Sequence, residues 1–427
     1  MTEANDSQMV QKSILGLNQL SYSLQPDLSV CTSRTSTTQF FISRQAAPGE
    51  NMIATLNTGA AFIWGPGCFI NLTIKNESSE KVDFGRGTAC NIFQRLSILT
   101  RSGVVVENID NVNLLAYQEL YYKRCKDYQE GVGQAAGFGA EGLLDAGKSK
   151  AFCIPLSMIS GLFSYENLLP SALMSGLRIE LTLATGLKAL RLDSSAASAV
   201  DLKYQVIDSS IQLDSYMLTD SVSRTLNESA ASSGLEVVIR THFCTVGTRE
   251  DTKLVQECRR AVSRALSAFV KCTTPRVSSE VDSLKKCPMQ STPIEEIAIP
   301  LGPVSYQFQF GSSYQPNAPA RGIDALKLAP QLFSHAQAAC KRYSKGMVDV
   351  ANSVTLTNFK AANWVFATDL ERTSTQSLSG IPLSNSRSLS IVADFEDGGV
   401  RLPQNTSFFL EYVTVIRVYS SNASIEV

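Results

Sequence analysis

The sequence predicts an all-β protein built from two similar domains. Short runs in which apolar and polar residues alternate recur along almost the whole chain of 427 residues, and clusters of Gly, Pro, Ser and Asn separate them. Few segments show the spacing of a helix. The order of elements in the first half also returns in the second half, about 210 residues later.

The first half contains six clear strand patterns and one helix pattern. In GLRIELTLAT, Leu177, Ile179 and Leu181 alternate with other residues, as expected of a half-buried strand. The expected strands lie at 37–44, 51–57, 68–76, 91–100, 176–185 and 201–218. Helical spacing predicts one amphipathic helix, whose stripe comprises Leu114, Leu115, Gln118, Tyr121 and Tyr122.

The second half follows a joint at 217–233 and is expected to contain the same elements. Strands are predicted at 234–246, 304–310, 354–359, 388–395 and 407–419. In the first of these, Glu236, Arg240 and His242 lie on a polar face opposite Leu235, Val237, Ile239 and Phe243. Residues 252–272 fit either a helix or a strand.

A second helix is expected from about Pro330, a residue that suits a first helical turn. Its apolar stripe comprises Leu332, Phe333, Ala336, Ala339, Cys340 and Tyr343. The internal repeat rests on matched positions: Pro170 precedes Leu177 by seven residues, and Pro382 precedes Leu389, with Ile391 behind it, by the same distance. The closing strands, at Tyr204 and Tyr412, show nearly the same offset.

Composition excludes several classes of protein. Hydrophobic residues make up 44% and charged residues 18%, which suits a well-cored globular protein and not a disordered one. No apolar stretch is long enough to span a membrane, and the N-terminus shows no secretory signal. The net charge is −1, and the first 36 residues hold only Lys12 and Arg34 as cations, so they are no basic nucleic-acid-binding arm.

The ten cysteines are expected to be free thiols in a reducing compartment, because they are spread singly and no signal peptide precedes them. The spacing of Cys244, Cys258, Cys272 and Cys287 looks regular, but zinc sites need close pairs. No metal site is therefore predicted.

One string fits a nucleotide-binding motif. GLLDAGKS (142–149) matches the P-loop pattern G-x-x-x-x-G-K-[ST], with Lys148 as its lysine. A phosphate cradle lies between a strand and a helix, whereas this string follows a small-residue loop and precedes KSKAFCIPLSM, which alternates like a strand. The overlapping GFGAEG (137–142) fails for the same reason. The sequence predicts an exposed loop here.

No catalytic set is visible. His242 and His335 are interpreted as surface or hydrogen-bonded histidines, and the acidic pairs Glu295/Glu296 and Glu396/Asp397 as solvated loop or edge residues. We assign no catalytic, cofactor-binding or metal-binding residue, and predict that the chain is not an enzyme.

Several segments together resemble the double jelly-roll, hexon-like major capsid proteins of double-stranded DNA viruses, most closely those of polinton-like viruses and virophages. They are IPLSMISGLFSYENLLPSALMSGLRIELTLA (154–184), YQVIDSSIQLDSYML (204–218), GLEVVIRTHF (234–243), YQFQFGSSYQPNAPA (306–320) and FFLEYVTVIRVYSSNASIEV (408–427). In that family the fourth segment resembles the strand and loop before the second domain's helix. The family has no shared catalytic residues to carry over.

The resemblance implies two tandem eight-stranded antiparallel jelly-roll sandwiches with a few short helices in connecting loops. The expected division is an N-terminal arm at 1–36, a first jelly roll at 37–219 and a second at 220–427. The implied function is a major capsid protein that forms pseudo-hexagonal homotrimeric capsomers in an icosahedral shell. The protein would be made in the reducing cytoplasm or nucleus of the host cell and be located in the virion.

The implied partners are two further copies in the homotrimer, neighbouring capsomers, and penton and minor capsid proteins. The arm segment QMVQKSILGLNQL (8–20) is predicted either to be a disordered terminus or to dock on a neighbouring trimer, a minor protein or an inner membrane. No sequence-specific nucleic-acid binding is expected. Two alternatives stay open: a single-jelly-roll RNA virus capsid or carbohydrate-binding β-sandwich, and a P-loop nucleotide-binding enzyme.

Overall fold

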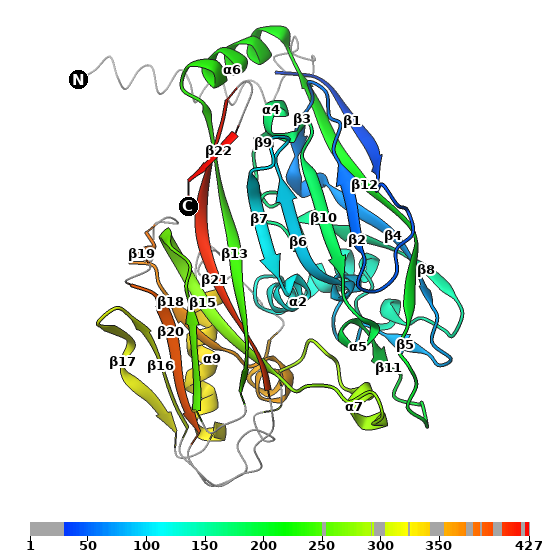
Figure 1. Cartoon of the computed structure of the whole chain (residues 1–427), viewed down its shortest axis with the longest axis vertical. Helices are drawn as coiled ribbons and strands as arrows, with labels where there is room; N and C mark the ends of the chain where they lie inside the picture. Colours follow the sequence, from blue (N-terminus) through cyan, green and yellow to red (C-terminus); the bar gives the residue numbers. More distant parts are fainter. Residues whose placement is uncertain are drawn as a thin grey trace, which may run out of the picture.

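The computed structural model describes residues 30–249, 253–291, 293, 304–322, 325–341, 354–372, 379–384, 387–395, 404–419 and 423–426. Strands dominate these residues. They form two sandwiches that lie side by side, one from each half of the chain (Figure 1). None of the described helices is long and apolar enough to cross a membrane.

Eight principal strands build the first sandwich. They are β1 (Cys31–Phe40), β2 (Asn51–Thr55), β4 (Phe69–Asn76), β6 (Phe93–Leu99), β7 (Val105–Asp110), β8 (Ser149–Pro155), β10 (Arg178–Leu183) and β12 (Tyr204–Leu218). One sheet has the order β1-β12-β4-β8, and the other has the order β2-β10-β6-β7. If the principal strands are numbered one to eight, these orders read 1-8-3-6 and 2-7-4-5.

The second sandwich repeats this order. Its principal strands are β13 (Leu235–Arg249), β14 (Lys253–Cys258), β15 (Val262–Thr273), β16 (Val304–Phe310), β17 (Ser313–Gly322), β18 (Phe366–Asp369), β20 (Leu389–Phe395) and β21 (Gln404–Val418). They form sheets β13-β21-β15-β18 and β14-β20-β16-β17, again 1-8-3-6 and 2-7-4-5. All of the paired neighbours are antiparallel. The predicted repeat of elements is thus confirmed at the level of topology.

Short strands extend these sheets or, in the case of β5 and β11, form a separate two-stranded sheet. In the first half they are β3 (Phe62–Trp64), β5 (Val82–Asp83), β9 (Leu168–Leu169) and β11 (Arg191–Leu192), and in the second half β19 (Ile381–Leu383) and β22 (Ala423–Glu426). Strand β22 pairs with the end of β21, so the last described residues return to the sheet.

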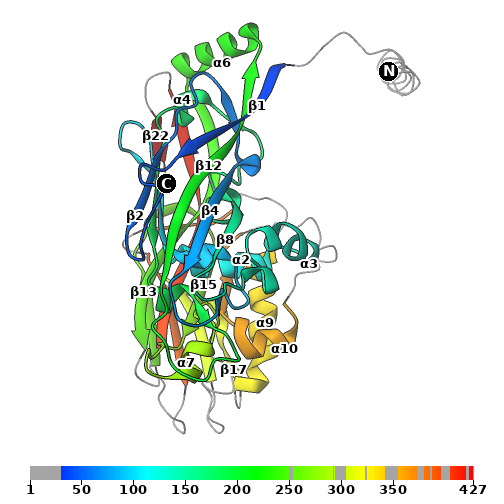
Figure 2. The ribbon, with the colours of Figure 1, turned by 90° about the vertical axis from the view of Figure 1, so that its right-hand side faces the viewer.

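The two long helices within the halves occupy equivalent places. Helix α2 (Val112–Tyr122) and helix α9 (Ala325–Lys341) each follow the fifth strand of their sandwich and precede the sixth. Helix α6 (Asp220–Ser232) joins the two halves at one end of the molecule (Figures 1 and 2). The shorter helices are α3 (Lys126–Tyr128), α4 (Ser171–Met174), α5 (Gly186–Ala189), α7 (Val281–Lys285) and α10 (Leu356–Asn358).

The predicted core positions are buried. Leu177, Ile179 and Leu181 in the first sandwich and Leu389 and Ile391 in the second have no exposed surface. Strand β10 lies between β2 and β6, and β20 lies between β14 and β16, so the two sets occupy equivalent places. The alternation of these residues is therefore confirmed as the inward-facing register of the seventh strand in each sandwich.

The first sandwich begins earlier than the sequence predicts. Strand β1 starts at Cys31, so residues 31–36, which were expected in the arm, belong to a strand; residues 1–29 lie outside the described residues. The sequence CTSRTSTTQF lacks apolar alternation because none of its side chains is buried in the single chain. A strand without a buried face leaves no periodic signal.

Three other expectations change. The strand predicted at 354–359 is wrong, because this segment contains α10 and a following helical turn. Residues 252–272, which fitted either element, form most of β14 and β15. The segment 306–320, expected to be a strand and a loop before the helix, forms two strands, β16 and most of β17. In each case pairing with or packing on distant residues overrides the local pattern.

The helices also differ from their predicted form. Helix α9 begins at Ala325 and contains Pro330 within it, because the buried Leu328 and Ala329 extend its apolar stripe towards the N-terminus. Helix α2 is not amphipathic, since every residue except Glu119 is buried. It lies between the two sandwiches and therefore has no solvent face.

Candidate functional site

The P-loop-like string lies in a turn that leads into a strand. Gly147 N–H donates to the Asn76 carbonyl, Lys148 N–H to that of Asp145, and Leu144 N–H to that of Val82. Ser149 begins β8 and no helix follows. Loop amides that already donate to the backbone, without a helix N-terminus behind them, are not arranged as a phosphate cradle. The overlapping GFGAEG forms a short 3₁₀ turn at Gly139–Gly142.

The two histidines have different surroundings. Of the two interpretations of His242, the surface one does not hold, because its side chain is 7% exposed and lies 3.8 Å from Glu119 of the first sandwich. His335 lies on α9, half-buried, and its Nδ1 contacts the Tyr306 hydroxyl, so it is a hydrogen-bonded histidine as predicted. The pairs Glu295/Glu296 and Glu396/Asp397 lie outside the described residues.

No three candidate metal ligands come together in the part of the chain that the structure describes. None of the nine cysteines whose side chains the structure describes is in a disulfide, and six of them are buried. Burial raises the pKa of the thiols of Cys68, Cys90 and Cys258 to about 12, so these side chains are unreactive at neutral pH.

Charged side chains gather instead at the junction between the sandwiches. Lys123, which follows α2, bridges two carboxylates: its Nζ lies 2.9 Å from Glu119 Oε1 and 3.2 Å from Glu411 Oε1 of β21. His242 Nε2 of β13 lies 3.8 Å from the same Glu119 oxygen. Ser267 Oγ of β15 donates to the other oxygen of Glu411. The C-terminal end of α2 and the following Lys123 are thereby joined to two strands of the second sandwich, β21 and β13, and Ser267 ties β15 to the same Glu411.

Burial and charge set the protonation of this cluster. Burial alone would raise the pKa of Glu119 and of Glu411, but the Lys123 ammonium outweighs it and lowers both. Burial, and next the Lys123 charge, lower the pKa of His242. The cluster is therefore a lysine between two carboxylates beside a neutral imidazole at neutral pH, with a net charge of −1.

A second contact fixes the loop at 160–162 against β13. Glu107 of β7 is fully buried and accepts hydrogen bonds from the Ser160 hydroxyl and the backbone N–H groups of Gly161 and Leu162. Burial raises the pKa of Glu107. Gly161 lies so close to β13 that an added Cβ would stand 1.7 Å from the Arg240 carbonyl oxygen. Only glycine permits this approach between the halves.

A third contact is a buried lysine. Lys271 of β15 has no exposed surface, its Nζ donates to Gln118 Oε1 at 3.3 Å, and it lies 4.3 Å from the Tyr117 ring centroid. Both partners belong to α2 of the other sandwich. Burial lowers the pKa of Lys271 from 10.5 to about 7.

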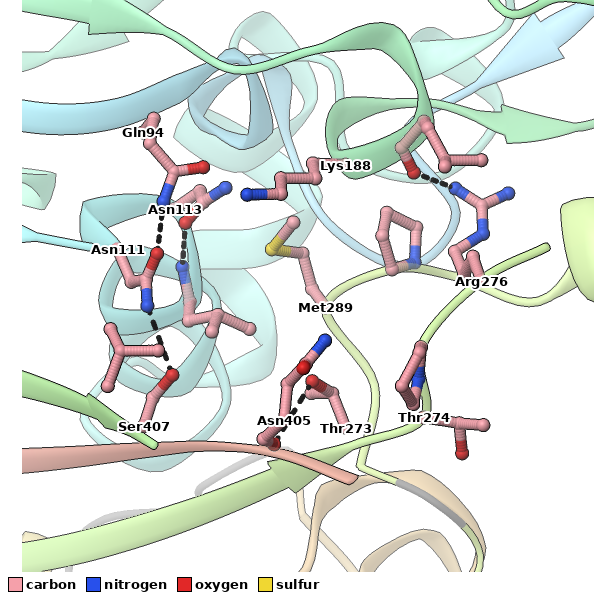
Figure 3. Close-up of a pocket in the computed structure, with 15 residues that line it drawn as sticks. Gln94, Asn111, Asn113, Lys188, Thr273, Thr274, Arg276, Met289, Asn405 and Ser407 are labelled. Atoms are coloured by element: carbon pink, nitrogen blue, oxygen red, sulfur yellow. Dashed lines mark hydrogen bonds between the residues drawn. The ribbon is translucent and has the colours of Figure 1, made fainter. Parts of the chain in front are cut away.

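A crevice of about 310 Å³ opens at the same junction. Figure 3 shows Asn111 between Gln94 and Ser407, and Arg276 at the opposite side. Asn111 Nδ2 donates to Ser407 Oγ, and the Arg276 guanidinium donates to the carbonyls of Leu187 and Leu190 in the first half. The polar groups of this crevice thus connect the halves, and none forms a nucleophile–base pair.

Together these contacts make the junction a structural site. Ion pairs, a buried lysine, a close glycine contact and backbone hydrogen bonds hold the sandwiches in one relative orientation, and a single buried core runs through both. The residues at the junction therefore serve to fix the two sandwiches to each other, as a rigid two-domain protein requires.

Sequence patterns missed these residues. Glu411 and Lys271 each interrupt a strand that is otherwise apolar, in FFLEYV and AFVKCT, and such a charge could have been noted as a contact outside the sandwich. Glu107, Glu119 and Lys123 carry no such signal, since they lie among ordinary polar residues.

No family model matches the sequence, and no curated protein sequence matches it. Solved structures do match. The PBCV-1 virus capsid superposes with a TM-score of 0.62 at 10% identity, over 95% of this chain and 98% of the other. The Faustovirus major capsid protein gives 0.61 at 6%, over 93% and 92%. The mavirus major capsid protein gives 0.51 at 8%, over 96% and 93%.

This chain has the double jelly-roll fold. The strand order 1-8-3-6 and 2-7-4-5 in both halves is that of a jelly roll, and the superpositions cover nearly the whole of each compared chain. The resemblance noted from the segments at 154–184, 204–218 and 408–427 is therefore confirmed for the fold. The single-jelly-roll alternative is excluded, because a second sandwich follows in the same chain.

Removing the buried lysine of this double jelly roll should stabilise it. The unfolded chain holds a proton on Lys271 up to about pH 10, and the folded chain only up to about pH 7. Between these values the unfolded state binds more protons, so the contribution of Lys271 to stability rises with pH and is least favourable below pH 7. Lys271→Met should raise the free energy of unfolding at pH 7 by about 1–4 kcal/mol.

Chemical denaturation at pH 7 and pH 9.5 measures this effect. The gain from Lys271→Met should shrink at the higher pH, where wild-type Lys271 is already neutral in the folded chain. Exposed Lys188 supplies the matched control, because Lys188→Met should change stability by less than about 0.5 kcal/mol at either pH. A Lys271→Met variant that is less stable than wild type at pH 7 would mean that the contacts with Gln118 and Tyr117 outweigh the cost of burial.

Proposed function

We propose that this chain is the major capsid protein of an icosahedral double-stranded DNA virus. The observation that carries the proposal is the double jelly roll itself, matched over at least nine-tenths of both chains by capsid structures from PBCV-1, Faustovirus and mavirus. The rigid junction supports the same conclusion. A shell subunit must hold its two sandwiches at one angle, and the contacts of Gly161, Lys123 and Lys271 across the halves do so.

The capsomer is a homotrimer in this proposal. Two similar sandwiches in each of three chains give six similar sectors about a three-fold axis, which is a pseudo-hexagonal tile. Such tiles pack into hexagonal arrays with neighbouring capsomers, and penton and minor capsid proteins complete the shell. The first jelly roll comprises residues up to 219 and the second residues 220–427, with α6 beginning at that boundary.

The chain encloses its genome without gathering it by charge. A net charge of −1 offers little counterion release on contact with DNA, so the genome enters by a separate process. The arm, of which residues 8–20 lie outside the described residues, docks on a neighbouring trimer, a minor protein or an inner membrane. The proposed location is the virion, after synthesis in the reducing cytoplasm or nucleus of the host cell. The proposed role is structural, with no catalytic activity.

The mass of the purified protein in solution tests the proposal. Light scattering coupled to size exclusion should report about three times the chain mass of 46.3 kDa at micromolar concentration. Negative-stain images of the same fraction should show pseudo-hexagonal particles. A monodisperse monomer would contradict the homotrimeric capsomer. Salt-sensitive binding of DNA by the trimer would contradict the proposal that the protein encloses its genome without binding it electrostatically.

A further inference from the structure

Strand β1 is exposed on both faces. None of its ten side chains is buried, whereas every other principal strand with a complete burial record contains buried residues. Large apolar side chains lie at its two ends: Phe40 is 51% exposed and Ile42 79% at one end, and Val30 is 51% and Met217 of β12 40% exposed at the other. These four residues and β1 define the β1 face.

The β1 face carries little charge and no protection against pairing. Among the described strands β1 pairs only with β12, so its second edge offers backbone N–H and C=O groups. Its one charged side chain, Arg34, forms a two-pronged ion pair with Asp214 of β12 at 2.7 and 2.9 Å. Exposed edges are usually blocked by lysine, proline or inward-pointing charges, and β1 contains none of these.

A second face with exposed apolar side chains and paired charges lies on the other sandwich. In sheet β14-β20-β16-β17, Val255 pairs with Val392, and Val392 pairs with Gln307, on the side away from the core. Val255 is 68% exposed, Tyr314 is 46% exposed and Val392 is 39% exposed. The carboxylates beside them are paired, Asp394 with Lys253 and Glu257 with Arg259. Val255, Val392 and Tyr314 define the β20 face.

The two faces lie on opposite sides of the chain. Figure 1 shows β1 and β12 on the right and β16, β17 and β20 on the left. Together these faces hold seven of the 13 exposed large apolar side chains among the described residues. Exposed apolar groups that gather in this way mark interaction sites. Two different faces on opposite sides suit head-to-tail contact, which closes into a ring when copies are related by rotation.

We propose that the β1 face of one copy binds the β20 face of the next copy around the three-fold axis. The occupant of each face is therefore a second copy of this chain. The charged groups beside each set of apolar side chains are already paired within the chain, so the contact buries apolar and hydroxyl groups without leaving a charge unpaired. This inference rests on the proposed homotrimer and names the surfaces that form it.

Paired glutamates placed on each face test the inference. Phe40→Glu/Ile42→Glu and Val255→Glu/Val392→Glu should each raise the concentration at which trimers dissociate by on the order of 100-fold, because the new charges would be desolvated at the contact. The side chains are exposed in the single chain, so the variants should fold, which a thermal melt of the monomer checks. The matched control is Val104→Glu/Val132→Glu, at exposed valines outside both faces, and it should leave the trimer unchanged.

Opposite charges identify the pairing of the faces. When Phe40→Lys/Ile42→Lys is combined with Val255→Glu/Val392→Glu in one chain, trimers should dissociate at a concentration at least tenfold lower than in the Val255→Glu/Val392→Glu variant. The reason is that lysines of one copy then meet glutamates of the next. Glutamate variants that remain trimeric like wild type would overturn the inference and leave the proposed capsomer intact. Dissociation without recovery in the combined variant would overturn the pairing. A wild-type monomer would instead contradict the proposed function itself.

Discussion

The Gly161→Ala variant should lose at least about 3 kcal/mol of folding free energy. A methyl group at this position would stand 1.7 Å from the Arg240 carbonyl oxygen of β13, which is far inside van der Waals contact. Neither side can move cheaply, because the Gly161 N–H donates to buried Glu107 and β13 is paired along its whole length with β21. The two jelly rolls must therefore separate locally, or the loop at 160–162 must leave Glu107 without its partners.

Chemical denaturation, together with the mass of the assembled protein, measures the effect of Gly161→Ala. We expect a lower denaturation midpoint and fewer trimers, because the angle between the sandwiches changes. Gly131 is the matched control: an added Cβ there meets nothing within 4 Å in a helical turn, so Gly131→Ala should be neutral or slightly stabilising. If the two alanine variants are equally stable, Gly161 does not lie in close contact with the Arg240 carbonyl oxygen.

Ile179→Asp should abolish folding of the first jelly roll. Ile179 has no exposed surface and is the second residue of β10, with Ala54 on one side and Ile98 on the other. A carboxylate at that point has no cation to pair with and must be buried charged or bind a proton, at a cost of about 4 kcal/mol or more. This is a large fraction of the stability of an ordinary domain.

Yield of soluble protein and limited proteolysis report the outcome for Ile179→Asp. The conservative Ile179→Val should cost only about 0.5–1.5 kcal/mol, and Val105→Asp, at an exposed position of β7, should remain folded. A soluble, protease-resistant Ile179→Asp trimer would mean that this side chain does not face the core.

Strands with one buried face were predictable from the sequence. The alternation in GLRIELTLAT and SLSIVADF places Ile179 and Ile391 in the core, and the structure buries both completely. Period-two patterns report directly which side of a strand meets the core, so they survive without tertiary information. The shared order of the elements in the two halves followed from the same patterns.

Elements whose environment comes from distant residues were not predictable. Strand β1 has no alternation because nothing in the single chain covers it, and α2 looks amphipathic although the second sandwich covers the side that would otherwise face solvent. His242 reads as a surface residue of β13 for the same reason: the polar face of that strand meets Glu119 and Lys123 of the first sandwich.

The sequence by itself determined the fold class, the repeat of two β-domains and the inward register of strands such as β10, because these depend on hydrophobic periodicity along each strand. It also showed that the flanks of GLLDAGKS do not suit a nucleotide. Only the tertiary structure decided how the two jelly rolls join. The contacts of Lys123 with Glu411, of Lys271 with Gln118 and of Gly161 with Arg240 connect residues that are 79 to 288 positions apart. No local pattern encodes such pairs, since each depends on the angle at which two finished sandwiches meet.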